Sequence, residues 1–452
     1  MSTMEQVPVL GKYHSYGAYS DTDAIWYKQK PSHWECERFK YHFVEKKKRS
    51  ASDLVAGAIS FGEVVYKDEE KLSQETKDSY QEVLSGEFLV NPLNLNFDLK
   101  SLRTALSNID VVVSTGYIVL QIREKTYPRF ARWLLHQFDV SHMKTLGSGV
   151  RQTINYADIG NSLFCLPPLE EQRTIAAFLD YETARIDKLI ARQQRLIELL
   201  KEKRQAVISH AVTKGLNPDA PMKDSGVEWL GEVPEHWDIK RLKHYITSMD
   251  QGWSPQCEAR LIEGEEFGVM KVGCVNGGVF RFQEHKALPS EIEPKIEYRL
   301  KKGQLLISRA NTRELVGSAA VVDADYDNLL LCDKLYRIGL SAGVNPEYVA
   351  LLLGVTAYRG QIELSASGAS DSMQNIGQAT IKELPIALPP KEELEAILHF
   401  VESKLHALDY LDHLFLKQNQ TLQERRTALI SAAITGKIDL RGWTAPVQEG
   451  AA

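Results

Sequence analysis

The sequence has no run of about 18 apolar residues, the length that a membrane-spanning helix needs. Its first residues contain no basic stretch followed by an apolar one, so we expect no signal peptide. We expect the protein to be cytoplasmic and not to associate with a membrane. We expect neither a disulfide framework nor a zinc site, because the cysteines are few, odd in number and never spaced as Cys-x-x-Cys. They are Cys36, Cys165, Cys257, Cys274 and Cys332.

Recognisable catalytic motifs are missing as well. The sequence has no GxxxxGK[ST] phosphate loop, no HExxH metal motif and no GxSxG nucleophile elbow. Glu293-Pro294-Lys295 is a carboxylate-x-Lys triplet near other acids, but such triplets are common and do not make a nuclease site by themselves. We therefore expect a recognition or scaffolding protein that is not an enzyme and binds no metal or cofactor of its own.

Length and charge set two further bounds. A chain of 452 residues is too long for one ordinary domain and suggests two to four. The net charge of −6 argues against a nucleic-acid binder that uses its whole surface, for which a basic chain is expected. The charge leaves room for a local basic groove.

One stretch of the sequence occurs twice. "LPPLEEQRTIAAFL" begins at Leu166 and "LPPKEELEAILHFV" at Leu388, 222 positions later, and the match extends in both directions without a gap. Upstream, "PSHWECERFK" from Pro31 matches "PEHWDIKRLK" from Pro234, 203 positions later. The middle of the second copy is therefore longer by 222 − 203 = 19 residues. A constant frame around two different inserts predicts two modules that do the same job on different targets.

A long amphipathic helix is predicted after each double proline. Proline suits a first helical turn, and the acids that follow suit a helix N-terminus. Positions 3 and 4 residues apart form a heptad pattern, so we expect the two helices to pack on each other as an antiparallel pair. The alternative is two core helices, each packed in its own domain. The predicted seam comprises Ile186, Leu189, Gln193, Leu196, Leu200, Lys203 and Val207, then Leu408, Leu411, Phe415, Gln418, Leu422, Arg425 and Leu429.

The inserts look strand-rich, with short apolar runs separated by turns. In the second insert, "GVMKVGCVNGGVFRF" (268–282) predicts two strands around an Asn-Gly-Gly turn. Strands alongside long helices indicate an α+β protein. Trp34 and Trp237 occupy equivalent frame positions and are expected in the core, and Trp253 is expected to be a packing residue.

The chain resembles the specificity subunit of type I restriction–modification enzymes over nearly its whole length. The resemblance rests on "RQTINYADI" followed by "LPPLEEQ", on "SGVEWLGEVPEHWDIKRLK", on "NPLNL" from Asn91 and on "LLISRAN" from Leu305. Two features depart from the family pattern. The second double proline is followed by "KEEL", and the first module lacks the "SGVEWLG" preface.

The resemblance implies a non-catalytic DNA-reading subunit with two target recognition domains, each reading one half of a bipartite double-stranded DNA site. The helices would form an antiparallel coiled coil with pseudo-two-fold symmetry, set the spacer and dock two DNA methyltransferase subunits. Those partners would bind S-adenosylmethionine, and partner restriction/translocase subunits would use ATP and magnesium.

The expected domains follow from the repeat and the resemblance together. They are an N-terminal extension (1–22), a first target recognition domain (23–165), a central long helix (166–215), a linker (216–226), a second target recognition domain (227–387), a C-terminal long helix (388–440) and a disordered tail (441–452).

Candidate DNA contacts are basic and amide side chains on the inserts, because arginine suits guanine and phosphate while asparagine and glutamine suit adenine. A solvated charge run or an ordinary turn is the alternative reading. The first insert supplies Lys46, Lys47, Lys48, Arg49, Ser148, Gly149, Arg151 and Gln152. The second supplies Ser308, Arg309, Asn311, Arg313, Ser370, Ser372, Gln374 and Asn375.

Two other functions stay open at this point. The chain could be the specificity subunit of a fused restriction–methylation system, which differs only in its partners. It could also be a helical scaffold that binds only protein, in which case exchanging an insert would not change any DNA specificity. A nuclease is a third reading, but it needs a clustered acidic metal site that the sequence does not supply.

Overall fold

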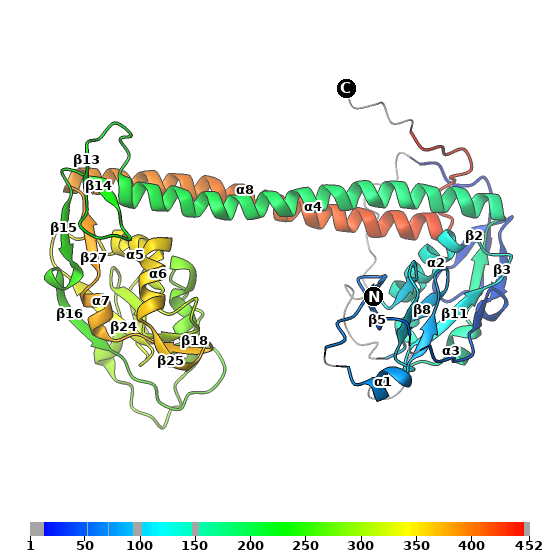
Figure 1. The fold of residues 1–452 in the computed structure, drawn as a ribbon, viewed down its shortest axis with the longest axis horizontal. Coiled ribbons are helices and arrows are strands. Elements are labelled where there is room, and N and C mark those ends of the chain that lie inside the picture. Colours follow the sequence, from blue (N-terminus) through cyan, green and yellow to red (C-terminus); the bar gives the residue numbers. More distant parts are fainter. Residues whose placement is uncertain (1–12, 52, 71, 94–101, 147–152, 447–452) are drawn as a thin grey trace. The chain divides into compact units, whose positions relative to one another are not determined.

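The computed structural model describes residues 13–51, 53–70, 72–93, 102–146 and 153–446 (Figure 1). They form two compact units. Unit 1 draws on Met1–Gln194 and Leu416–Ala452, and unit 2 is Arg195–Phe415. Each unit therefore holds one insert and one half of each long helix. The architecture is a mixed α+β fold, as predicted.

The repeated frame has the same strands in both units. In unit 1, β1 (Tyr19–Asp21) pairs with β2 (Gln29–Pro31), and β3 (Glu35–Arg38) pairs with β12 (Leu163–Leu166). In unit 2, β13 (Met222–Asp224) pairs with β14 (Glu232–Pro234), and β15 (Asp238–Arg241) pairs with β27 (Pro385–Leu388). The short helices α3 (Tyr156–Gly160) and α7 (Gln378–Lys382) also correspond. The offsets of 203 and 222 residues are thus offsets between equivalent elements.

The first insert is built on a six-stranded sheet in the order β4-β11-β8-β9-β6-β5. Successive residues of a strand point to opposite faces. Phe88 and Val90 accordingly pack with α2 (Pro128–Ser141), whereas Leu89 belongs to a second core with Val111 and Val113. The strands are β4 (Phe43–Glu45), β5 (Gly57–Ser60), β6 (Glu63–Tyr66), β8 (Phe88–Val90), β9 (Thr104–Leu106) and β11 (Ile118–Ile122), beside the pair β7 (Gln81–Val83) and β10 (Val111–Val113) and the short helix α1 (Gln74–Asp78).

The second insert uses the same alternation over three sheets. Leu305 and Ile307 face the core that contains α5 (Pro346–Gly354), and Leu306 lies in the neighbouring core. The helix α6 (Thr356–Ser365) follows α5. One sheet contains β16 (Ile246–Gln251), β24 (Leu335–Leu340), β20 (Leu305–Ser308) and β22 (Ala319–Val321); another contains β18 (His285–Ala287), β17 (Gly268–Met270), β23 (Tyr326–Leu330) and β19 (Arg299–Leu300); the third contains β21 (Ala310–Asn311), β26 (Met373–Asn375) and β25 (Ser367–Ser370).

The predicted hairpin at residues 268–282 is wrong. Only Gly268–Met270 is a strand there, and a 3-10 segment follows at Val272–Gly278. Cys274 and Val275 are completely buried in this segment, so the apolar residues cover the core from a helical turn instead of a second strand.

The long helices are α4 (Leu169–Lys214) and α8 (Lys391–Ile434). Within each unit, half of α4 runs antiparallel to half of α8 (Figure 1). In unit 1, Gln193 Nε2 donates to Gln418 Oε1 at 2.8 Å, and Asp187 pairs with Arg426 at 2.9 Å. In unit 2, Arg204 pairs with Asp409. The predicted antiparallel helix pair is confirmed.

Six of the fourteen predicted seam residues are exposed. Leu189, Leu196 and Leu411 are 45%, 43% and 37% exposed, and Lys203, Gln418 and Arg425 are exposed too. The C-terminal neighbour of each is half-buried or buried instead, although Gln418 still contacts Gln193 of the other helix. The seam contains Ile186, Ile190, Gln193, Ile197, Leu200, Arg204 and Val207 of α4, and Leu408, Asp412, Phe415, Asn419, Leu422, Arg426 and Leu429 of α8.

The register error has a simple physical origin. Leu189-Ile190 and Leu196-Ile197 are adjacent apolar pairs, so the sequence carries two apolar stripes and only one can face the partner helix. The charged contacts between the helices also come from residues next to the predicted ones. Arginine–aspartate pairs join the helices where Lys203 and Arg425 were expected.

A carboxylate hydrogen-bonds each helix start to the frame; Glu171 in unit 1 is buried, and Glu393 in unit 2 is partly exposed. In unit 1, Glu171 Oε1 accepts a hydrogen bond from Trp34 Nε1 at 3.0 Å and another from the Tyr16 hydroxyl, and its Oε2 lies 2.8 Å from His33 Nε2. In unit 2, Glu393 Oε2 accepts from Trp237 Nε1 at 3.1 Å and lies 2.6 Å from His236 Nε2. Both tryptophans are 1% exposed, which confirms their expected place in the core.

The C-terminal ends of the long helices close on the same tryptophans. Gly215 and Gly436 follow α4 and α8 with φ of 78° and 68°. A Cβ on Gly436 would meet Pro31 at 2.4 Å and Trp34 at 3.2 Å, and one on Gly215 would meet Trp237 at 3.4 Å. Glycine is therefore needed for both the left-handed backbone and the close approach.

Three expected boundaries are corrected by the contacts of the flanking segments. The proposed linker contains β13, and the proposed extension contains β1. The proposed disordered tail begins with ordered residues, because the Trp443 ring packs on Phe178 at a centroid distance of 5.5 Å.

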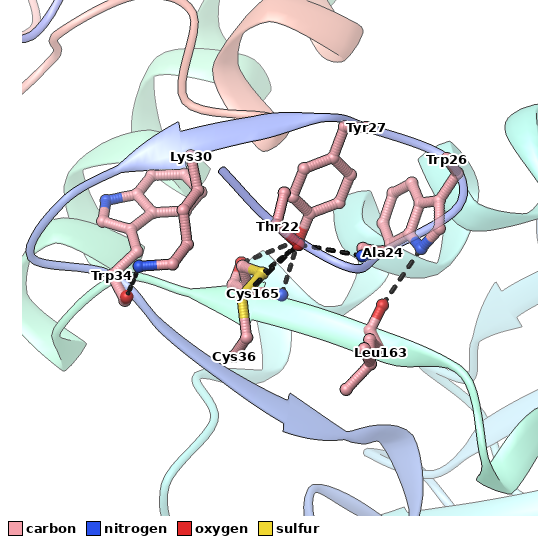
Figure 2. Close-up of a disulfide and its surroundings, with 9 residues drawn as sticks. All are labelled: Thr22, Ala24, Trp26, Tyr27, Lys30, Trp34, Cys36, Leu163 and Cys165. Atoms are coloured by element: carbon pink, nitrogen blue, oxygen red, sulfur yellow. Dashed lines mark hydrogen bonds between the residues drawn. A yellow bond between two sulfur atoms is a disulfide. The ribbon is translucent and has the colours of Figure 1, made fainter. Parts of the chain in front are cut away.

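The expectation of no disulfide is also corrected. Cys36 and Cys165 form one across β3 and β12 (Figure 2).

Replacing Glu171 by alanine should destabilise unit 1 strongly. The change leaves the buried Trp34 and Tyr16 donors without their acceptor, at about 1–3 kcal/mol for each group. We expect the free energy of unfolding to fall by about 2 kcal/mol or more, measured by denaturant unfolding. E170A is the matched control, because the Glu170 side chain is 85% exposed. Equal stability of E171A and E170A would contradict the assigned role.

Acidification should destabilise unit 1 through His136. Burial, with Arg426 and Arg132 nearby, lowers the pKa of His136 from 6.5 to about 4. Between these values the unfolded chain binds a proton that the folded chain does not, so stability is lost as pH falls from about 6.5 to 4, by at most about 3 kcal/mol. Unfolding of wild type and H136Q at pH 7 and pH 4.5 measures this loss, which should be smaller in H136Q. An identical loss in both proteins would rule out His136 as the source.

Candidate nucleic-acid interface

The third sheet of unit 2 brings the two predicted DNA-contact segments of the second insert together. Strand β26 lies between β21 and β25, and Asn311 of β21 is the register partner of Gln374 of β26. The backbone N–H of Arg313 also donates to Asp371 O at 3.0 Å. Segments about 60 positions apart in the sequence thus form one surface, here called the β21–β26–β25 surface.

Three of the predicted residues are available on this surface. Arg313, Ser370 and Ser372 are exposed. The Arg313 guanidinium lies 3.5 Å from the Asp371 carboxylate, and both side chains are more than half exposed. An exposed ion pair of this kind contributes little free energy, so a phosphate or a base edge can displace the aspartate at small cost.

Four other predictions in this insert are corrected by burial and hydrogen bonding. Ser308 is fully buried and donates to Leu315 O at 2.9 Å. Asn311 donates from Nδ2 to Asn276 Oδ1 at 3.0 Å and accepts from the Thr312 N–H. Because Asn311 is 9% exposed and each end of its amide already makes a hydrogen bond inside the protein, it is not available to read adenine. Gln374 is equally buried and donates to Ser370 O at 2.8 Å, and half-buried Arg309 donates to Asp333 O at 3.3 Å.

Asn375, the remaining prediction in this insert, is half-buried on β26 opposite Ala310. No structural observation decides whether it reaches DNA, and it stays a prediction.

Sequence reasoning missed three residues beside this surface. Asn276 holds Asn311, and the exposed Arg281 donates to the Asn276 carbonyl oxygen. Lys334 is exposed, and its carbonyl oxygen accepts from the Arg309 N–H at 2.9 Å. The Asn-Gly-Gly sequence that was read as a hairpin turn was the available signal. It positions an amide and an arginine at the surface instead.

The basic run of the first insert divides into buried and exposed residues. Lys46 is 12% exposed and pairs with Glu87 at 2.8 Å and Glu82 at 3.1 Å, so its charge is already neutralised and it is withdrawn as a phosphate contact. Lys48 Nζ donates to Thr115 O at 2.9 Å from an exposed position. Lys47 and Arg49 are exposed. Ser148, Gly149, Arg151 and Gln152 lie outside the described residues.

Metal or nucleophilic chemistry finds no support in the part of the chain that the structure describes. No group of three or more His, Cys, Asp and Glu side chains among those residues could hold a metal ion. Burial raises the pKa of Cys332 to about 12 and that of Cys274 above its ordinary value, so these thiols stay protonated near neutral pH. No described helix is both long and apolar enough to cross a membrane.

Trp253, considered as a possible contact, is half-buried against the neighbouring core of unit 2. The Lys295 ammonium lies 4.9 Å from the centroid of its ring. The packing interpretation is therefore confirmed.

Comparison with known proteins gives one consistent picture. Residues 100–199 match the model of the type I restriction modification DNA specificity domain. The chain is 30% identical over 243 residues to the EcoEI specificity subunit of Escherichia coli, covering 53% of this chain and 40% of that one. It is 26% identical over 251 residues to the EcoKI specificity subunit of Escherichia coli K12, covering 55% and 51%. The matches thus span about half the length of these relatives.

A solved structure shares the fold. A chain from a study of complex assembly and conformational transition in a type I restriction–modification system superposes with a TM-score of 0.67 at 18% identity, covering 91% of this chain and all of that one. At this identity the likeness concerns the fold alone. Together with the sequence relatives, it confirms the resemblance inferred from the motifs.

Arg313 should contribute to DNA affinity in a way that Arg309 does not. Losing one phosphate contact reduces the slope of log K against log salt by about 1. We expect this for R313A, measured as DNA binding at several salt concentrations. R309A is the matched control, because it removes the same charge from a half-buried position. Equal slopes for R313A and wild type would exclude Arg313 as a contact.

Proposed function

Because the chain is a relative of the specificity subunits of type I restriction enzymes, we propose that it is the DNA-reading, non-catalytic subunit of a type I restriction–modification complex. Each insert would read one half of a bipartite site in double-stranded DNA. One observation carries the proposal: the same strands, tryptophan and carboxylate recur in both units around inserts with different sheets.

The division into frame and insert explains why the net charge can be negative. A recognition subunit needs base-reading groups on small surfaces, such as Arg313, Ser370 and Ser372, and it can leave much of the phosphate binding to its partners. In this proposal the partners are two DNA methyltransferase subunits that carry S-adenosylmethionine and restriction/translocase subunits that use ATP and magnesium. The complex would work in the cytoplasm.

The exposed leucines of the long helices are candidate docking points for the methyltransferase subunits. Leu189 and Leu416 are 45% and 54% exposed in unit 1, and Leu196, Leu199 and Tyr410 are 43%, 41% and 64% exposed in unit 2. Apolar side chains that are not needed in the seam are typical of a surface that a partner covers. The frame repeats, so each unit offers a helix pair to one partner.

The proposed function can be tested by sequencing the modified bases of DNA from cells that express the chain with its companion methyltransferase subunit. A split motif of two short half-sites that is lost without this chain is the expected result. Exchanging residues 227–387 for those of a relative should change only one half-site. Methylation that is independent of this chain would overturn the proposal and favour a protein-only scaffold.

Docking through the leucines has a separate test. L196E/L199E should lose most co-purification with the methyltransferase subunit, because two charges would be buried at the contact. K203E is the matched control, since Lys203 is exposed on the same helix. Unfolding of both variants should match wild type. Undiminished co-purification of the double variant would place the contact elsewhere.

A further inference from the structure

Cys36 and Cys165 close the base of the first insert. They are register partners on β3 and β12, and they are joined by a disulfide (Figure 2). The two residues are 129 positions apart, and the six-stranded sheet of unit 1 lies between them in the sequence. A bond at this point therefore ties together the two strands through which the insert joins its frame.

The second module shows that the frame folds without this bond. The equivalent residues are Ile239 and Ala387, which are also register partners, on β15 and β27. An apolar pair thus occupies the equivalent position between the two paired strands. The cysteines of unit 1 are not needed for the strand pairing itself, so the disulfide adds something that unit 2 lacks.

Hydrogen bonds that do not involve the disulfide hold the backbone beside the pair. The Cys165 N–H donates to the Tyr27 hydroxyl at 2.5 Å, and Trp26 Nε1 donates to Leu163 O at 3.0 Å, so Trp26 and Tyr27 hold β12 at Cys165 and at Leu163 (Figure 2). Thr22 Oγ1 lies 3.6 Å from Cys165 Sγ and 3.9 Å from Cys36 Sγ. Cys165 is fully buried, whereas Cys36 is only half-buried, so a dissolved thiol or disulfide would approach from the side of Cys36.

The remaining cysteines offer no competing partner within unit 1. Cys257, Cys274 and Cys332 are free and all belong to unit 2. Burial raises the pKa of each of these thiols, which disfavours the thiolate that thiol–disulfide exchange requires.

We propose that Cys36–Cys165 is a reversible modification site at which a low-molecular-weight disulfide, such as oxidised glutathione, covalently closes the first module. Two thiols lose their protons and two electrons and form one S–S bond. The oxidant's own S–S bond breaks, and the oxidant leaves as two thiols. In a reducing compartment the pair is a dithiol, and β3 and β12 are joined without a covalent bond. The inference concerns the chain itself and does not depend on the proposed function.

Closing the bond should affect unit 1 alone. A crosslink between distant residues restricts the unfolded chain, so the module that carries it resists unfolding more. We expect the midpoint of thermal unfolding of unit 1 to rise with oxidation, while unit 2 unfolds unchanged.

The first test counts free thiols in the full chain, quenched and denatured after incubation with dithiothreitol or with oxidised glutathione. We expect all five thiols after reduction and three after oxidation, with peptide mass mapping linking Cys36 to Cys165. Five free thiols under both conditions, or a linkage between other cysteines, would overturn the proposal.

Two variants separate the bond from the fold. C36I/C165A installs the residues of the second module, so it should fold, keep three thiols under both conditions and lose the oxidant-dependent rise in the unfolding midpoint. I239C/A387C is the matched gain of function, and it should form an oxidant-dependent link in unit 2. An unchanged rise in C36I/C165A would show that the oxidant acts elsewhere and would overturn the proposal.

Discussion

Each unit depends on one carboxylate at the start of a long helix, which is buried in unit 1 and partly exposed in unit 2. Glu171 and Glu393 accept hydrogen bonds from the indole N–H of Trp34 and Trp237, two of the largest fully buried side chains. A buried indole needs an acceptor, and a buried carboxylate needs donors, so neither group tolerates loss of the other. This bond ties the helix to the strand that opens the module. The insert and both of its strands are then held at a constant base.

Constancy at the base leaves the inserts free to differ. The first insert has one six-stranded sheet, and the second spreads its strands over three. Both strands at the heart of the inserts alternate their side chains between two cores, as Phe88–Leu89–Val90 and Leu305–Leu306–Ile307 show. The central strand of each insert therefore needs apolar residues on both of its faces. Loops and edge strands are left to carry the residues that face a ligand.

The polar residues of the inserts show how far burial decides their role. Asn311 and Gln374 have the amide chemistry that suits adenine, yet their amides are committed to Asn276 and Ser370. Arg313 lies on the same surface with an exposed and easily displaced partner. Lys46 and Lys47 are adjacent in the sequence, but only Lys46 is neutralised by two glutamates. The chemical type of a residue was enough to select it as a candidate. Tertiary contacts then showed which candidates are committed to internal bonds and which are exposed for contact with DNA.

The sequence by itself determined the repeat, the two long helices, their antiparallel pairing and the resemblance to type I specificity subunits, because these depend on spacing and on motifs local in the chain. It did not determine which apolar stripe enters the seam, since Leu189 and Ile190 have the same hydrophobic character and differ only in what approaches them. The sequence also did not determine three tertiary features: the carboxylate–tryptophan hydrogen bond, the Cys36–Cys165 pairing and the β21–β26–β25 surface. Each joins residues far apart in the sequence, and only the tertiary structure decides which of those residues meet.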